Sequence, residues 1–202
     1  MKSCIRLMCL AVMLTTVGQV QAEFLTFDNV PLGSLQNGVG DMPTYKGFNF
    51  SSTLDWMDTV DSTWNFGAHS GDFTLLNNNG GIGVITAVGD VDFTFDGLWA
   101  KKWNTPAESG GSNYMFGVLS GFNDGLLVWA VSTSLNGSFQ YFGPQSGAID
   151  ELRLNFGDHF LVDDIELNSN LVPEPASMAI WGIGALGIGL VARRRKKQSD
   201  AE

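Results

Sequence analysis

The chain has 202 residues, and 21 acidic side chains against 11 Lys and Arg give it a formal net charge of −10. Such an acidic chain repels phosphate backbones, which excludes a general nucleic-acid-binding protein. Hydrophobic residues make up 44% of the sequence, too large a share for a disordered chain.

The N-terminus has the features of a secretory signal peptide. Lys2 and Arg6 give it a basic start, and an apolar run follows over residues 7–17. Val20-Gln21-Ala22 then fits the small-x-small pattern of a signal-peptidase site. We therefore expect residues 1–22 to be a helical signal sequence that signal peptidase removes.

Residues 23–170 are expected to form the folded domain. Both cysteines, Cys4 and Cys9, precede it, so the domain has no disulfide. Residues 23–175 contain 19 acidic and 4 basic side chains, a net charge of −15. A domain of this charge stays dispersed in solution and attracts cations rather than anionic surfaces.

Short runs of β-branched and aromatic residues, separated by Gly- and Asn-rich turns, indicate an all-β fold. In the run from Val91 to Asp96, apolar and acidic or hydroxyl side chains alternate, as in a strand with one buried face. No helical periodicity is sustained within the domain. We predict a single antiparallel β-sandwich of the jelly-roll type. The predicted strands cover residues 24–27, 47–51, 73–76, 82–88, 91–98, 114–119, 126–132, 138–142, 149–156 and 159–167.

Two adjacent carboxylates stand out in the last predicted strand. Neighbouring side chains on a strand point to opposite faces, so Asp163 or Asp164 should face inward and need a partner. Asp28 follows the first strand, and the ends of a sandwich chain often lie close together. One hypothesis is a structural Ca²⁺ held by Asp28, Asp163 and Asp164 with backbone carbonyls. The alternative is hydrogen bonding to loop amides or water. No other cofactor is expected.

Aromatic residues are abundant enough to permit sugar stacking. Trp56, Trp64 and Trp103 fall in loop-like stretches beside polar residues, so we expect them to be exposed and name them as candidate glycan contacts. Core packing is the alternative for each. The stretch from Asp55 to Asp61 has an Asp at every third position, which does not match a calcium-binding EF-hand and predicts a solvated acidic loop.

Signatures of catalysis are thin. His69 and His159 are the only histidines, the domain has no cysteine nucleophile, and Ser70-Gly71-Asp72 is not a nucleophile elbow. We expect no enzyme. Glycoside hydrolysis by two carboxylates stays open as an alternative because acidic residues are plentiful.

The C-terminus has three parts in a fixed order. Residues 172–176 contain Pro173, Glu174 and Pro175, which favour extended backbone. Residues 176–192 are apolar and Gly-rich, and as a helix they reach the short end of the range that spans a bilayer. A basic tail over 193–197, which includes Arg193, Arg194 and Arg195, then holds this end in the cytoplasm.

This arrangement resembles the PEP-CTERM sorting signal of Gram-negative bacteria over residues 171–202. The resemblance implies transient anchoring in the inner membrane and processing by an exosortase near Pro173-Glu174-Pro175. Release from the cell or attachment at its surface would follow. The family is associated with exopolysaccharide, biofilm and floc formation. An ordinary single-pass anchor is the alternative.

The last predicted strand carries a second resemblance. Its pattern, apolar-x-Asp-Asp-Ile-x-apolar over residues 161–167, resembles the closing strand of jelly-roll modules of the carbohydrate-binding type. The two resemblances together imply an exported, non-catalytic module of the cell surface or extracellular matrix that interacts with exopolysaccharide. A purely structural surface protein and a glycan-active enzyme are the alternatives.

Overall fold

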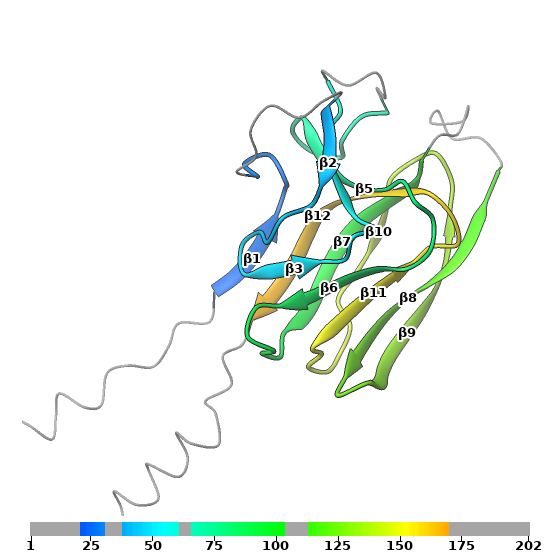
Figure 1. Cartoon of the computed structure of the whole chain (residues 1–202). Coiled ribbons are helices and arrows are strands. Elements are labelled where there is room, and N and C mark those ends of the chain that lie inside the picture. Colours follow the sequence, from blue (N-terminus) through cyan, green and yellow to red (C-terminus); the bar gives the residue numbers. More distant parts are fainter. Residues whose placement is uncertain (1–20, 31–37, 61–65, 104–112, 170–202) are drawn as a thin grey trace, which may run out of the picture. The chain divides into compact units, whose positions relative to one another are not determined.

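The computed structural model of the whole chain describes residues 21–30, 38–60, 66–103 and 113–169 (Figure 1). This part contains twelve strands, all paired antiparallel, and no α-helix. The strands are β1 (Gln21–Leu25), β2 (Val39–Asp41), β3 (Phe48–Phe50), β4 (Asp55–Asp58), β5 (Phe73–Asn77), β6 (Gly83–Ala87), β7 (Thr94–Lys102), β8 (Met115–Asn123), β9 (Leu126–Leu135), β10 (Gln140–Phe142), β11 (Glu151–Asn155) and β12 (Phe160–Ser169).

The strands form two sheets that pack face to face. The first sheet has the order β10-β7-β12-β5-β4-β2, with β1 also paired to β12, and the second has the order β3-β6-β11-β8-β9. Strand β12 lies inside the first sheet, with β7 on one side and with β5 and then β1 on the other. The predicted all-β antiparallel sandwich is thus confirmed, whereas its jelly-roll connectivity stays a prediction.

The main core lies between the sheets. On β11, Leu152 and Leu154 are fully buried while Glu151 and Arg153 are not, which is the alternation of a strand with one wet face. Phe95 and Phe160 contribute large rings from the first sheet. Burial of each such ring contributes about 1.5–3 kcal/mol to the free energy of folding. The domain therefore relies on its core for stability, since it has no cysteine to form a disulfide.

A second, smaller core lies on the outer side of the first sheet. Met57, Leu76 and Leu161 alternate with residues of the main core, so they face the other way, and Trp103 packs with them. Because this side is also covered, β4 is buried on both faces. The predicted acidic loop at 55–58 is therefore wrong: Asp55 and Met57 are buried in a strand. Strands β2 and β4 are the two elements that the sequence patterns did not predict.

The first and last strands lie side by side, as Figure 1 shows. Gln21 is paired with Ser169 and Leu25 with Ile165. The contacts of the chain divide after Asn170. Residues 1–20 of the predicted signal helix and the whole predicted membrane helix fall outside the described residues, whereas Gln21 and Ala22, the last two residues of the predicted signal sequence, begin strand β1. Within the described part no helix is long and apolar enough to cross a membrane.

Candidate functional site

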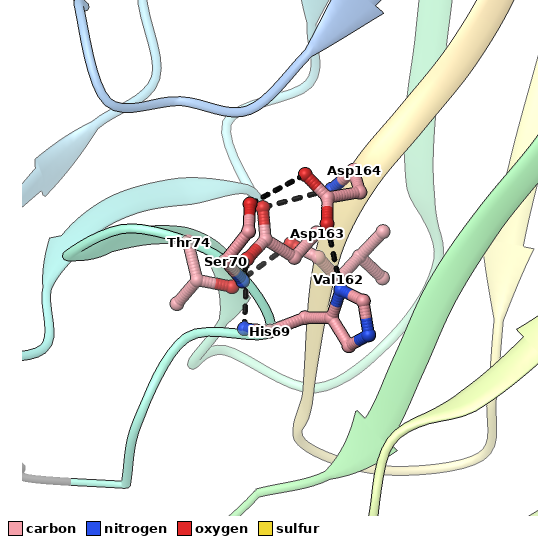
Figure 2. A network of polar contacts seen from close by, with 6 residues as sticks. All are labelled: His69, Ser70, Thr74, Val162, Asp163 and Asp164. Atoms are coloured by element: carbon pink, nitrogen blue, oxygen red, sulfur yellow. Dashed lines mark hydrogen bonds and ion pairs between the residues drawn. The ribbon is translucent and has the colours of Figure 1, made fainter.

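A loop over residues 66–72 covers part of the outer face of the first sheet and is held there by carboxylates of β12. Asp163 Oδ2 accepts hydrogen bonds from the backbone N–H groups of His69 at 2.8 Å and Ser70 at 3.1 Å. Asp164 Oδ1 accepts from Ser70 Oγ at 2.7 Å, and its Oδ2 lies 2.6 Å from His69 Nδ1. Figure 2 shows both carboxylates reaching the same two loop residues.

Both carboxylates reach one loop because the strand is irregular at this point. Asp164 has a φ of +48°, and the pairing of β12 with β7 shifts register between Asp163 and Glu166. Such a bulge breaks the alternation of side chains along a strand. The prediction that Asp163 and Asp164 point to opposite faces is therefore wrong.

Of the two carboxylates that bind the loop, Asp163 is fully buried, which disfavours its charged form. Burial raises the pKa of Asp163 to about 7, and the nearby Asp164 carboxylate also raises it. The N–H groups of Ser70, Asp164 and His69 pull the pKa down but do not cancel the burial. The group therefore titrates near neutral pH.

Asp28 holds the other end of the same loop. Its Oδ1 accepts from the N–H groups of Asp72 at 3.0 Å and Phe73 at 3.3 Å. Gly71 adopts a φ of +59°, and a Cβ there would overlap the Asp28 carboxylate, so the carboxylate can approach only because this residue is glycine. Asp28, Asp163 and Asp164 thus share one loop, as their proposed joint role required.

The three carboxylates bind the loop itself and do not surround a common point. No group of three or more His, Cys, Asp or Glu side chains in the described part is arranged to hold a metal ion. The arrangement expected for a calcium ion is therefore not formed by Asp28, Asp163 and Asp164. The hydrogen bonds are those of the alternative, in which loop amides satisfy the buried oxygens.

Three rings lie in a row across this face, which we call the aromatic row: His69, Trp99 and Tyr141. The imidazole of His69 stacks on Trp99 with ring centroids 4.0 Å apart and planes 15° from parallel. Tyr141, on the neighbouring strand β10, lies beside Trp99, with ring centroids 5.3 Å apart and ring planes at 44°. Strand register explains the row, since Trp99 on β7 is paired with Tyr141 on β10 and with Asp163 on β12.

The contact with Asp164 determines which nitrogen of the His69 imidazole carries the proton. A carboxylate only accepts hydrogen bonds, so Asp164 favours a proton on Nδ1 of His69. The Nε2 atom points away from this network (Figure 2) and can accept a hydrogen bond from outside. Phe139 supports the ring edge-on at 5.4 Å, so His69 is held by three neighbours.

Tyr141 is the most open member of the row, with 51% of its surface exposed. Its ring lies over Gly97, where a Cβ would be 2.8 Å from Cε2 and 2.9 Å from Cζ. Its hydroxyl donates to the carbonyl of Asp96 at 3.3 Å. The ring is thus fixed on one side and open to solvent on the other.

None of the predicted glycan contacts, Trp56, Trp64 and Trp103, belongs to the aromatic row. Trp56 is 8% and Trp103 6% exposed, so the expectation that both are exposed is wrong. Trp56 stacks on Phe73 at 4.8 Å and donates from Nε1 to the carbonyl of Phe27. Trp103 packs edge-on against Phe66 in the outer core. Trp64 falls outside the described residues.

Trp99 and Tyr141 were missed as site residues. The signal was present for Trp99, which lies between the core residues Leu98 and Ala100 and must therefore face outward. Nothing in the sequence showed that Tyr141 would pair with it.

The C-terminal segment provides the clearest comparison with known proteins. Residues 171–196 match the model of the PEP-CTERM protein-sorting motif. The chain carries a PEP-CTERM sorting motif. The match spans the predicted sorting residues Pro173, Glu174 and Pro175 and the predicted stop at Arg193, Arg194 and Arg195, all outside the described residues. A PEP-CTERM motif indicates a secreted protein with a C-terminal sorting signal, so the predicted export of this chain is confirmed. Anchoring in the inner membrane stays a prediction.

Two solved structures similar to the sandwich are carbohydrate-binding modules. The C-terminal family 22 module of Clostridium thermocellum Xyn10B is 11% identical with a TM-score of 0.37, over 75% of this chain and 95% of that one. TmCBM61, solved with beta-1,4-galactotriose, is 12% identical with a TM-score of 0.35, over 67% of this chain and 97% of that one. No curated protein matches this chain.

Proposed function

We propose that this protein is sorted by an exosortase to the cell surface or extracellular matrix and that its sandwich binds exopolysaccharide without cleaving it. The observation that carries the binding proposal is the aromatic row, a fixed set of rings on the outer face of a rigid sheet. The sorting motif supports the destination, since it brings the sandwich to where exopolysaccharide accumulates.

The chemistry of the row suits a sugar chain. Aromatic faces pack against the C–H faces of sugar rings, and polar groups beside them bind the hydroxyls. Tyr141 offers an open face, and Nε2 of His69 offers an acceptor at the other end of the row. The His69 ring is held by Asp164 and stacks on Trp99, so a ligand loses little free energy in ordering that part of the row.

Contacts at the carboxylates favour binding over catalysis. Asp163 and Asp164 are buried, and their oxygens accept hydrogen bonds from the loop and from the Asp164 N–H. The Ser70 hydroxyl donates to Asp164, so Ser70 and His69 share one carboxylate and do not form a relay from serine to histidine. We therefore propose a non-catalytic module, with glycan hydrolysis as the alternative that the experiment below also tests.

The binding experiment uses the sandwich alone. Every described strand lies within residues 21–169 and the contacts of the chain divide after Asn170, so residues 21–170 form a complete folding unit. Co-sedimentation with the host exopolysaccharide, against an unrelated polysaccharide, measures binding, and an assay for new reducing ends in the same tubes measures cleavage. We expect selective retention and no new reducing ends.

A matched pair of variants locates the site. Tyr141→Ala should lower retention at least tenfold, whereas Tyr114→Ala, at a tyrosine that is equally exposed at 52%, should leave it unchanged. Equal effects of the two changes would move the site away from the aromatic row. No retention of the unmodified domain would leave a purely structural surface protein.

Sorting is tested separately in the host. Signal peptidase, the inner membrane and an exosortase are the proposed processing partners. Glu174→Ala should leave a longer form in the membrane fraction, while the unchanged chain is processed to a shorter surface or released form. Processing that is indifferent to Glu174 would contradict exosortase sorting and would not affect the binding result.

A further inference from the structure

The outer face of the first sheet carries a carboxylate and a further exposed ring beside the aromatic row. Phe24 on β1 is paired with Glu166 on β12, and Glu166 is paired with Gly97 on β7. Ile165 and Leu167, on either side of Glu166, both belong to the main core, so Glu166 faces outward. Phe24 faces outward with it, because residues that are paired directly opposite each other share a face of the sheet.

The pairing brings three groups into line across the sheet, which we call the cross-strand strip: the ring of Tyr141, the carboxylate of Glu166 and the ring of Phe24. The Tyr141 ring occupies the space of a side chain on Gly97, directly opposite Glu166. Phe24, on the other side of Glu166, is 47% exposed. Two strand spacings separate β7 from β1, about 10 Å. The strip therefore adds a carboxylate and one more ring to the surface that begins at the aromatic row.

Glu166 is the member of the strip that lacks a partner. Within the described part of the chain its carboxylate takes part in no hydrogen bond and no ion pair, although it is half-buried. Asp163 and Asp164 on the same strand, by contrast, accept hydrogen bonds from the loop over 66–72. The ammonium of Lys46 reaches β1 but donates to the carbonyl of Phe24. A half-buried carboxylate of this kind favours a ligand that supplies a positive charge or hydrogen-bond donors.

Three polar groups of this surface accept hydrogen bonds. Nε2 of His69 accepts because Asp164 favours a proton on Nδ1. The Tyr141 hydroxyl gives its one proton to the carbonyl of Asp96, which leaves its oxygen as an acceptor. The carboxylate of Glu166 accepts only. A ligand that meets all three must supply donors, and the net charge of −15 on the domain favours donors that are positively charged.

We propose that the cross-strand strip binds a sugar that carries a protonated amine, so that the polysaccharide recognised by the sandwich is one with free amino groups. The ammonium pairs with Glu166 and lies beside the rings of Tyr141 and Phe24, since aromatic faces attract cations. This inference rests on the proposed function and adds the class of polysaccharide that the site selects. Polysaccharides of uronic acids are disfavoured, because Glu166 and the charge of the domain repel them.

Two ligands that differ in charge test the proposal. Titration calorimetry measures the binding of glucosamine oligomers to residues 21–170, and of the same oligomers after every amine has been acetylated. In mildly acidic buffer at physiological salt, we expect the aminated oligomers to bind about tenfold more tightly, the effect of one hydrogen bond to a charged group. Equal affinity for the two forms, or no binding of the aminated form, would overturn the proposal.

Matched variants separate this site from a general attraction between an acidic domain and a cation. Glu166→Gln should remove most of the preference for the aminated oligomers, whereas Asp90→Asn, which removes the same charge from an exposed turn, should preserve it. Phe24→Ala should weaken binding, whereas Phe116→Ala, at a ring that is 72% exposed on β8, should not. Thermal melts check that each variant is folded. Equal effects of Glu166→Gln and Asp90→Asn would assign the preference to net charge and overturn the site.

The host exopolysaccharide distinguishes a failure of this inference from a failure of the proposed function. Acetylation of its free amines should lower its retention by the domain. Retention that survives acetylation and still depends on Tyr141 would leave the binding function in place and overturn the amino-sugar class. If the untreated polymer is not retained, the proposed function falls, and the oligomer titrations decide whether the strip binds an amino sugar.

Discussion

The ring of Tyr141 occupies the space that a side chain on Gly97 would need. A Cβ atom on Gly97 would lie 2.8 Å from Cε2 and 2.9 Å from Cζ of that ring. Strand β7 thus lacks a side chain at the position where the neighbouring strand places this ring, and the ring occupies that space. The orientation of the most exposed ring in the row therefore depends on a glycine.

Gly97→Ala should consequently displace Tyr141 and reduce polysaccharide retention several-fold. The ring is the exposed end of a flexible side chain and can move aside, so we expect the free energy of unfolding to change by about 1 kcal/mol or less. Gly143→Ala is the control, because a Cβ there would meet the same ring at an ordinary 3.5 Å. If Gly143→Ala weakened retention as much as Gly97→Ala, the position of the ring would not explain binding.

Removing the Asp164 carboxylate should weaken the attachment of the loop over residues 66–72, which Asp163 and Asp28 also hold. Asp164→Ala loses hydrogen bonds to Ser70 and His69, and bonds to a charged group contribute about 1.5–3 kcal/mol each. We expect urea unfolding to show a loss of this order. Asp90→Ala is a fitting control, because Asp90 is exposed and shares the left-handed backbone, with φ of +54° against +48°. Equal losses would assign the effect to backbone strain.

Stability should fall as the pH rises through neutrality because of Asp163. Its pKa is about 7 in the folded chain and 3.8 in the unfolded chain, so between these values the folded state holds the proton more tightly. The stabilisation is present at acidic pH and is lost as the pH rises, at up to about 1.4 kcal/mol per pH unit.

Unfolding curves at pH 5 and pH 8 test this sign. Asp163→Asn should flatten the difference, while Asp90→Asn should preserve it. Burial also raises the pKa of Asp55, which gives a slope of the same sign in all three proteins. A slope in Asp163→Asn equal to that of the unchanged domain would contradict the assignment.

Calcium should not stabilise the sandwich. Asp28 Oδ1 and Asp163 Oδ2 accept hydrogen bonds from loop N–H groups, so an ion bound by these atoms would have to compete with those bonds. We expect the melting temperature of residues 21–170 to be the same in a chelator and in excess Ca²⁺. A clear rise with Ca²⁺, removed by Asp28→Ala, would restore the calcium hypothesis.

The strands that the sequence predicted best are those with one wet face. On β11 the alternation from Glu151 to Asn155 follows directly from burial, so both the strand and its inward residues could be read in advance. Strand β4 could not, because Asp55, Trp56 and Met57 are all buried and no period of two appears. Its burial depends on the outer core, which forms from residues far apart in the chain.

The candidate site was only partly predictable for a related reason. The adjacent Asp163 and Asp164 are visible in the sequence as groups that need partners, and Asp28 binds the same loop as they do. Their partners, His69 and Ser70, lie more than ninety positions away. The left-handed backbone of Asp164 reverses the expected direction of its side chain. No pattern of residues in the sequence predicts this backbone conformation. Their polar sequence neighbours predict that Trp56 and Trp103 are exposed, but tertiary packing buries both side chains.

The position of β12 also determines how the sandwich responds to mechanical force. The sorting motif begins two residues after Ser169, so a pull on the C-terminal side of the chain enters the domain along β12. That strand is paired along its length with β7, the strand that carries Trp99. Tension between Trp99 and the C-terminal side of the chain therefore passes through the pairing of β7 with β12. The hydrogen bonds of that pair share the tension in shear, whereas a hairpin pulled from its open end would lose them one by one.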